Sequence, residues 1–307
     1  MADAAPAETA SATQNPSPNG TSGAAATSKD ISISWTDPNY KPPSGYLGNL
    51  SASQQKALDQ FRKELQDEGH FVEERMDDST LLRYLRARKW DVALAKKMLF
   101  DREKWREDFQ LDKLMKCVLE FDFKEKKEVD KYYPQYYHKV DKEGRPVYVE
   151  KLGALNLTEL MKITTQERQI QALVYEYEIF ERERLPACSK AAGHPVETSC
   201  TILDLKGVGL GKFWDVKNYV QEAAGIGQNY YPERMGKFYI VNSSWMFTTI
   251  WSVIKGWLDP ATVAKISITN SNDILKQQIP LENLPADLGG KCSCPGGCSL
   301  SDAGPWH

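Results

Sequence analysis

Two segments in the second half of the chain combine side chains that could bind a phosphorylated, hydroxyl-rich group. The segment YYPERMGK contains Glu233 and Arg234. One structural unit later, LDPATVAK contains Thr262 and Lys265. Cations bind phosphate, whereas carboxylate and hydroxyl oxygens accept hydrogen bonds from sugar hydroxyls. Adjacent parallel strands would bring the two segments together, although a structural network of salt bridges is the alternative for the same residues.

A further cationic pair lies where a predicted helix ends. The run RYLRARK finishes with Arg88 and Lys89 just before Asp91, which is suited to cap the next helix. At such a junction the two side chains can meet an anion. Pairing with the nearby acids Asp77 and Asp78 is the alternative.

Hydroxyl and aromatic side chains indicate another polar subsite. In TSCTILDLKG, strand alternation places Ser199 and Thr201 on one face, which Leu203 continues. Buried hydroxyls need partners, and a lipid phosphate at the mouth of an apolar pocket would supply them. Aromatic faces can bind a quaternary ammonium group, although ordinary packing is the alternative. The tyrosines considered for this role are Tyr137, Tyr148 and Tyr177.

The segment WMFTTIWSVIKGWL, residues 245–258, is the most apolar stretch of the chain. It is too short for the ~20 residues of a membrane-spanning helix, and Lys255 interrupts it. An all-round apolar helix normally lies in a core. Since indole N–H groups need partners, we favour a helix that closes a pocket with one face and contacts a bilayer with the other. Its assigned residues are Trp245, Phe247, Ile250, Trp251, Ile254, Trp257 and Leu258.

Motifs for catalysis, cofactors and metals are incomplete. The run GVGLGK, residues 207–212, is followed by Phe213 where a phosphate loop needs Ser or Thr, so we interpret its glycines as turn residues. A nucleotide-dependent enzyme is the rival hypothesis. Cys292, Cys294 and Cys298 lack C-x-x-C spacing, which favours a flexible reduced tail over a metal site. We expect no enzymatic activity, cofactor or metal.

The elements that would position these residues predict an α/β fold. Residues 1–46 are expected to form a disordered or irregular arm. Helices follow over residues 47–120, with a capping box at Ser51 and Gln54. Asp78 or Ser79 is expected to cap the second helix, and Thr164 a later one. In residues 121–291, the hairpin YYHKV-PVYVE and the runs CTILDL, KFYIV and KISIT alternate with helices, predicting a mainly parallel sheet before a tail at 292–307.

The composition limits the classes of function. The 307 residues carry a net charge of −3, which argues against a globally basic nucleic-acid binder. No secretory signal opens the chain, so we expect a cytoplasmic protein with free thiols.

Several long strings resemble the CRAL-TRIO family. They are LRYLRARKWDV, YPQYYHKVDKEGRPVY, LPACSKAAGHPVETSCTILDLKG, QNYYPERMGKFYIVN and LDPATVAKI. The resemblance runs from about Leu47 through Gly290 and implies a helical subdomain, a lipid-binding domain with a sheet floor, and a gating helix. One departure is Ser243, because the family usually places proline just after Asn242.

The resemblance also implies ligands for the candidate residues. The phosphatidylinositol headgroup would be held by Arg88, Lys89, Glu233, Arg234, Thr262 and Lys265. The phosphatidylcholine headgroup would be held by Tyr137, Tyr148, Tyr177, Ser199 and Thr201.

The expected function is exchange of single phospholipids at membranes. We expect a monomer that contacts Golgi and other endomembranes transiently. There it would support phosphoinositide metabolism, with a phosphatidylinositol kinase as a partner, and secretory traffic. The alternative is a regulatory module that senses lipid without net transfer.

Overall fold

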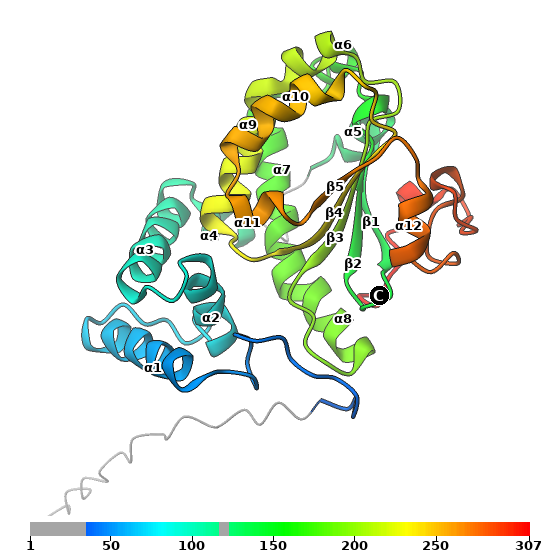
Figure 1. Ribbon diagram of the computed structural model, residues 1–307. Helices are drawn as coiled ribbons and strands as arrows, with labels where there is room; N and C mark the ends of the chain where they lie inside the picture. Colours follow the sequence, from blue (N-terminus) through cyan, green and yellow to red (C-terminus); the bar gives the residue numbers. More distant parts are fainter. Residues whose placement is uncertain (1–34, 117–122) are drawn as a thin grey trace, which may run out of the picture. The chain divides into compact units, whose positions relative to one another are not determined.

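The computed structural model describes residues 35–116 and 123–307. Both stretches belong to one compact unit, Trp35–His307. The disorder expected before residue 30 lies outside the described residues. Four helices come first, in the predicted region (Figure 1): α1 (Ala52–Asp67), α2 (Asp78–Ala87), α3 (Val92–Asp108) and α4 (Leu111–Lys116). Ser51 and Gln54 form the predicted capping box at α1.

A five-stranded sheet has the order β1-β2-β3-β4-β5. Its strands are β1 (Gln135–Val140), β2 (Pro146–Glu150), β3 (Ser199–Asp204), β4 (Met235–Val241) and β5 (Ile266–Ile268). The pair β1 and β2 is antiparallel, and the other neighbouring pairs are parallel. The predicted hairpin and parallel units are therefore confirmed.

Helices cover both sides of this sheet. They are α5 (Lys126–Tyr132), α6 (Leu157–Leu160), α7 (Gln166–Ile179), α8 (Leu185–Ala192), α9 (Leu210–Tyr230), α10 (Phe247–Ile254), α11 (Pro260–Val263) and α12 (Asp273–Gln278). A π-helical turn, Phe180–Arg184, joins α7 to α8. Figure 1 shows α7, α9 and α10 on one side of the sheet and α12 with the C-terminal segment on the other.

Two helix caps lie next to the predicted residues rather than on them. Asp77, rather than Asp78 or Ser79, caps α2 by accepting an amide hydrogen bond at 2.8 Å. Thr165, rather than Thr164, caps α7 in the same way at 3.2 Å. Neighbouring residues of similar type can compete for a cap, and only the backbone conformation decides between them.

The two faces of the sheet are packed to different degrees. On the face toward α12, Ile202 and Val241 are completely buried. On the face toward α9 and α10, Leu203, Phe238 and Ile266 are only partly buried. We call this second face, which also carries the partly buried Ser199 and Thr201, the inner face. Because strand residues alternate between faces, the α12 face carries the more completely buried apolar residues, whereas on the inner face Ile240 is buried but several other apolar residues are not.

None of the helices in residues 35–116 and 123–307 is long and apolar enough to cross a bilayer.

The observed cap of α2 makes a testable prediction. Asp77→Ala should lower the free energy of unfolding by about 1 kcal/mol, because an amide of the first turn loses its acceptor. Asp77→Asn should retain most of that stability, since asparagine caps helices about as well as aspartate. Urea unfolding followed by circular dichroism measures both variants, and equal losses would contradict the capping role.

Candidate functional site

Glu233 and Lys265 come together where β4 and β5 begin. The Lys265 ammonium lies 3.2 Å from a Glu233 carboxylate oxygen, and their side chains are 29% and 21% exposed, respectively. Glu233 adopts a left-handed backbone conformation with φ of 58°. Thr262 lies beside them, since its carbonyl accepts the Lys265 amide at 3.0 Å. Parallel pairing of the strands thus joins the two segments as predicted, in a pair that remains within reach of a ligand.

Arg234, by contrast, is engaged in a buried ion-pair network around Glu181. Its Nε donates to Glu181 at 2.7 Å and its Nη1 to the Glu197 carbonyl at 3.1 Å. Arg83 donates to the same Glu181 oxygen at 3.0 Å, and Arg102 lies 3.7 Å from the other oxygen. Burial alone would raise the pKa of Glu181, but the guanidinium groups outweigh it and hold that pKa well below its ordinary value. The salt-bridge alternative therefore describes Arg234.

Arg88 and Lys89 lie at the end of α2. Arg88 is half-buried and donates to the Ala87 carbonyl at 3.2 Å, whereas Lys89 is exposed. The proposed acidic rivals are engaged elsewhere, because Asp77 caps α2 and Asp78 pairs with Arg62. Within residues 35–116 and 123–307, no carboxylate forms an ion pair with either cation. Among the carboxylates that the structure describes, none therefore competes with an anionic ligand there.

Three neighbouring strands assemble most of the second predicted set. Tyr137 of β1 pairs in register with Tyr148 of β2, which pairs with Thr201 of β3. The tyrosine ring centroids are 5.0 Å apart. The hydroxyl oxygens of Ser199 and Thr201 are 3.3 Å apart. Two aromatic rings and two hydroxyls therefore stand together, as strand alternation predicted for the hydroxyls.

Tyr177 approaches from α7, where its ring stacks on Tyr231 with centroids 4.6 Å apart. Burial raises the pKa of Tyr177 to about 12 and that of Tyr148 well above its ordinary value, so both phenols stay neutral. Both side chains nevertheless keep part of their surface accessible. Both phenols are therefore partly accessible neutral aromatic groups on the inner side of the sheet.

Sequence reasoning missed charged residues near these tyrosines. Glu150 ends β2 two residues after Tyr148, and burial raises its pKa. Glu176 of α7 also has a pKa raised by burial, and it lies 3.2 Å from Arg184. The Arg184 guanidinium lies 4.3 Å from the centre of the Tyr137 ring. Strand alternation could have placed Glu150 with Tyr148, but the π-helical turn that positions Arg184 has no clear sequence signal.

The predicted apolar helix is shorter than expected. α10 spans Phe247–Ile254 and continues as a single 3-10 turn, so Trp245 precedes it and is 83% exposed. Phe247 and Ile250 are buried against α9 and the inner face. Trp251, Ile254, Trp257 and Leu258 are partly buried. The helix is thus apolar toward the sheet and carries a polar outer side, rather than being apolar all round.

The connection before α10 carries Ser243 at the position where the family usually has proline. Asn242 adopts φ of 54° and donates to Asp204 at 2.7 Å. The amide of Ser243 donates to the Thr269 carbonyl at 3.1 Å. Proline could not make this bond, so Ser243 adds a link between the ends of β4 and β5.

The cysteines at the C-terminal end are packed against β1 instead of forming a flexible tail. Cys292 is buried, and its sulfur lies 3.3 Å from a ring nitrogen of His138. The two residues are 154 positions apart in the sequence, so local sequence patterns could not predict this contact.

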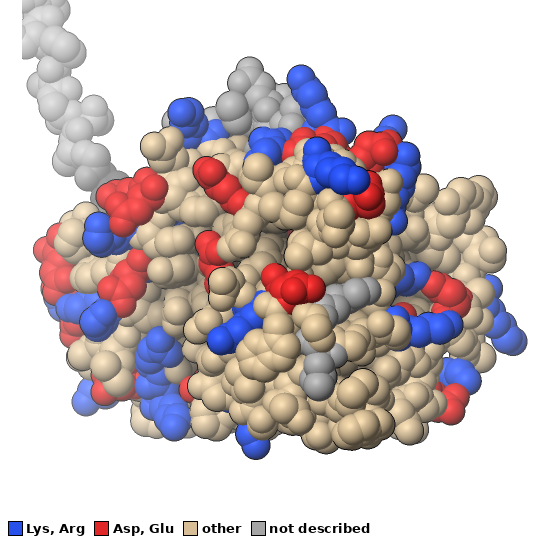
Figure 2. All heavy atoms as spheres, turned by 90° about the horizontal axis from the view of Figure 1, so that it is seen from above, with Lys and Arg blue, Asp and Glu red and all other residues tan. Residues whose placement is uncertain are grey.

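Charge is mixed on the face of the molecule seen from above. Figure 2 shows Lys and Arg interspersed with Asp and Glu, with uncharged surface between them. This face therefore offers no broad basic surface, in keeping with the net charge of −3.

Comparison with known proteins decides the family. Residues 130–290 match the CRAL/TRIO domain, and residues 57–101 match the CRAL/TRIO N-terminal domain. The chain belongs to the CRAL-TRIO family. The predicted family and fold class are confirmed.

Relatives across fungi and plants share the CRAL-TRIO region. The chain is 53% identical over 282 residues to the "Sec14 cytosolic factor" of Schizosaccharomyces pombe, covering 91% of this chain and 97% of that one. It is 41% identical over 260 residues to the "Phosphatidylinositol/phosphatidylcholine transfer protein SFH12" of Arabidopsis thaliana, covering 83% and 47%. The crystal structure of Sfh5 has the same fold, with a TM-score of 0.61 at 18% identity over 84% of this chain and 93% of that one.

The contrast between Arg234 and Lys265 can be measured. Arg234→Met should lower the free energy of unfolding by about 3 kcal/mol, because it breaks a buried ion pair. Lys265→Met should cost less than about 1 kcal/mol, because its pair is partly exposed. Chemical denaturation compares the two variants. Equal, small losses would mean that Arg234 is not part of the structural frame of this CRAL-TRIO protein.

Proposed function

We propose that this protein is a phosphatidylinositol/phosphatidylcholine transfer protein, which binds one phospholipid and exchanges it at membranes. The observation that carries the proposal is the inner face of the sheet. Its apolar side chains Leu203, Phe238 and Ile266 stay partly exposed, while apolar residues such as Ile202 and Val241 on the opposite face of the same sheet are completely buried. The name of the Arabidopsis relative supports both lipids as ligands.

An apolar compartment explains why such a protein is useful. Two acyl chains carry roughly 30 methylenes, and at ~0.8 kcal/mol each their exposure to water costs on the order of 20 kcal/mol. Spontaneous desorption from a bilayer is therefore slow. Leu203, Phe238 and Ile266 would contact these chains on the sheet side.

The two headgroups would use separate residues. Lys265, Arg88 and Lys89 supply cations for the inositol phosphate, while Glu233 and Thr262 accept from ring hydroxyls. Arg234 holds the Glu233 segment in place through Glu181.

Phosphocholine would lie against the strand residues. The hydroxyl groups of Ser199 and Thr201 would donate hydrogen bonds to the phosphate. Tyr137, Tyr148 and Tyr177 present neutral aromatic faces to the quaternary ammonium group.

Exchange requires the compartment to open, and α10 is the element suited to move. It is held by apolar side chains such as Phe247 and Ile250, contacts that a membrane can replace at little cost. Trp245, exposed beside it, suits the bilayer interface. Opening at the membrane would let one lipid leave and another enter before α10 closes again.

In the cell, we place this activity in the cytoplasm with transient contact at Golgi and other endomembranes. The protein would act as a monomer, without catalytic groups or cofactor, and supply lipid for phosphoinositide metabolism by a phosphatidylinositol kinase and for secretory traffic. The name "cytosolic factor" of the fungal relative supports the soluble location.

Filling the compartment should abolish transfer. Purified protein should accelerate the movement of labelled phosphatidylcholine and phosphatidylinositol from donor to acceptor vesicles. Leu203→Trp should reduce both rates at least about tenfold, because the indole occupies acyl-chain volume, whereas the volume-conserving Leu203→Met should retain them. Mass spectrometry of co-purified lipid should show phospholipid in the Met variant and little in the Trp variant. Wild-type protein that binds phospholipid without accelerating exchange would instead support a lipid-sensing module.

The two headgroup sets should separate by mutation. Lys265→Ala should reduce phosphatidylinositol transfer about tenfold or more, the effect of losing a charge-assisted hydrogen bond worth about 1.5–3 kcal/mol, with phosphatidylcholine transfer nearly unchanged. The double variant Ser199→Ala, Thr201→Ala should show the reverse preference. Both lipids are assayed in one vesicle preparation. Parallel losses in both variants would contradict separate sites.

A further inference from the structure

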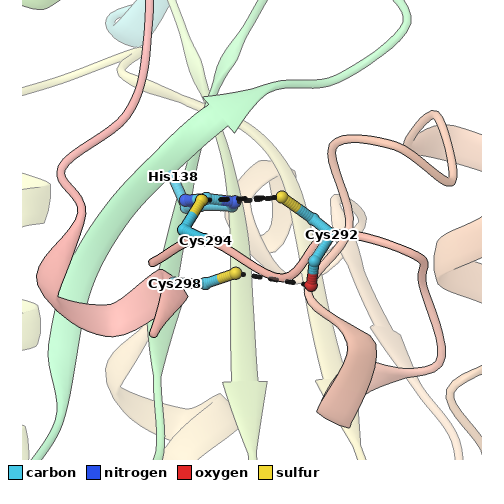
Figure 3. A group of neighbouring side chains, drawn as sticks. All are labelled: His138, Cys292, Cys294 and Cys298. Atoms are coloured by element: carbon cyan, nitrogen blue, oxygen red, sulfur yellow. Dashed lines mark hydrogen bonds between the residues drawn. The ribbon is translucent and has the colours of Figure 1, made fainter. Parts of the chain in front are cut away.

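Four side chains from distant parts of the sequence converge beside the edge strand β1. Figure 3 shows His138 of β1 facing Cys292, Cys294 and Cys298 from the C-terminal segment. One ligand atom from each residue lies within 4.8 Å of all the others. The sulfurs of Cys292 and Cys294 are 3.7 Å apart, and His138 Nε2 lies 3.3 Å from the Cys292 sulfur.

The hydrogen bonds of His138 are compatible with a tautomer that can bind a metal. Its Nδ1 lies 3.1 Å from the Ser301 hydroxyl, whose single proton is donated to the Cys298 carbonyl at 2.9 Å. With that proton on the carbonyl, the hydroxyl accepts from Nδ1–H, and the lone pair of the neutral imidazole lies on Nε2, 3.3 Å from the Cys292 sulfur. A histidine that ligates a metal is usually oriented by such a bond from its other nitrogen.

The backbone holds the sulfurs on one side of a tight turn. The Cys292 amide and carbonyl bond to Leu284 and Ala286, both at 3.0 Å. Between Cys294 and Cys298, Gly296 and Gly297 adopt φ of 77° and 100°, and the Gly297 amide donates to the Cys294 carbonyl at 2.9 Å. Glycine is the residue that adopts this left-handed conformation without strain, so the turn is built to return the chain to the cluster.

We propose that His138, Cys292, Cys294 and Cys298 bind a zinc ion. Three thiolates and one imidazole form a ligand set typical of structural zinc sites, whereas calcium and magnesium prefer oxygen ligands. With zinc–sulfur bonds of about 2.3 Å, a tetrahedral site places its sulfurs about 3.8 Å apart. The 3.7 Å separation of Cys292 and Cys294 matches this spacing.

A disulfide is the competing use of these cysteines. Bonded sulfurs lie about 2.05 Å apart, and a single bridge would leave the third sulfur and the oriented imidazole without a role. Cys188 and Cys200 are also free, but they are buried away from this cluster in the apolar cores. The convergence of four ligand atoms favours the metal.

The ion would fasten the C-terminal segment to β1. Beyond the cluster, Asp302 lies 3.6 Å from Arg184, and the Trp306 ring lies 5.7 Å from the same guanidinium and 6.3 Å from Tyr137. His138 and Tyr137 are consecutive residues of β1 and point to opposite faces. Zinc on one face would therefore steady the residues that cover Tyr137 on the other.

Metal analysis of the full-length protein tests the proposal. Untagged protein purified with a thiol reductant and without chelator should contain about one zinc per chain by inductively coupled plasma mass spectrometry. After replacement by Co²⁺, it should show the intense thiolate-to-metal charge-transfer band and visible d–d bands of tetrahedral coordination. Cys294→Ser and His138→Gln should lower the zinc content and weaken these bands. Cys188→Ala and His307→Gln are the matched controls outside the cluster and should retain both.

Unfolding temperatures measured with and without a zinc chelator test the proposal even if some variants fold poorly. A zinc chelator should lower the unfolding temperature of the wild-type protein but not that of Cys294→Ser, because the metal stabilises only the folded site. Wild-type protein without zinc and without cobalt bands would overturn the proposal. So would an intact mass of the unreduced protein two daltons low with a disulfide mapped to the cluster, or equal metal loss from Cys188→Ala and Cys294→Ser.

Discussion

Glu181 is the group on which the arrangement of this chain depends. It lies in the π-helical turn after α7 and binds Arg83 of α2, Arg102 of α3 and Arg234 before β4. One carboxylate thus connects the N-terminal helices to the segment before β4 that carries Glu233. Charges desolvated to this degree are tolerated only when their partners stay in place, so the network acts as a fixed frame.

On the same side of the sheet as α7, helix α10 is held in a different way (Figure 1). Phe247 and Ile250 attach α10 through apolar contacts, which have no directional requirement and can be exchanged for lipid. The Ser243 amide and the Asn242 side chain anchor the segment just before it. A rigid frame around Glu181, together with a helix that makes no ion pair to the sheet among the described residues, would suit the opening proposed above.

Sequence patterns predicted the strands and the main helices correctly because local side-chain chemistry determines them. Alternation in CTILDL predicted which face of β3 carries Ser199 and Thr201, and the spacing of YYPERMGK and LDPATVAK predicted that Glu233 would meet Lys265. The patterns could not predict that Arg234 would turn to Glu181, because a π-helical turn sets that contact. They also missed His138 beside Cys292, since spacing rules for metal ligands describe contiguous motifs and this set spans the fold.

The two edge strands of the sheet, β1 and β5, bear on whether the protein would aggregate if α10 opened. An edge strand offers unpaired backbone groups to which another chain can add a strand of its own. Here β5 is only three residues long, and the C-terminal segment lies along β1, where the Lys139 amide bonds to the Ala303 carbonyl. If α10 moves away as proposed, the uncovered sheet would present a short edge and a covered one, an arrangement that discourages self-association into aggregates.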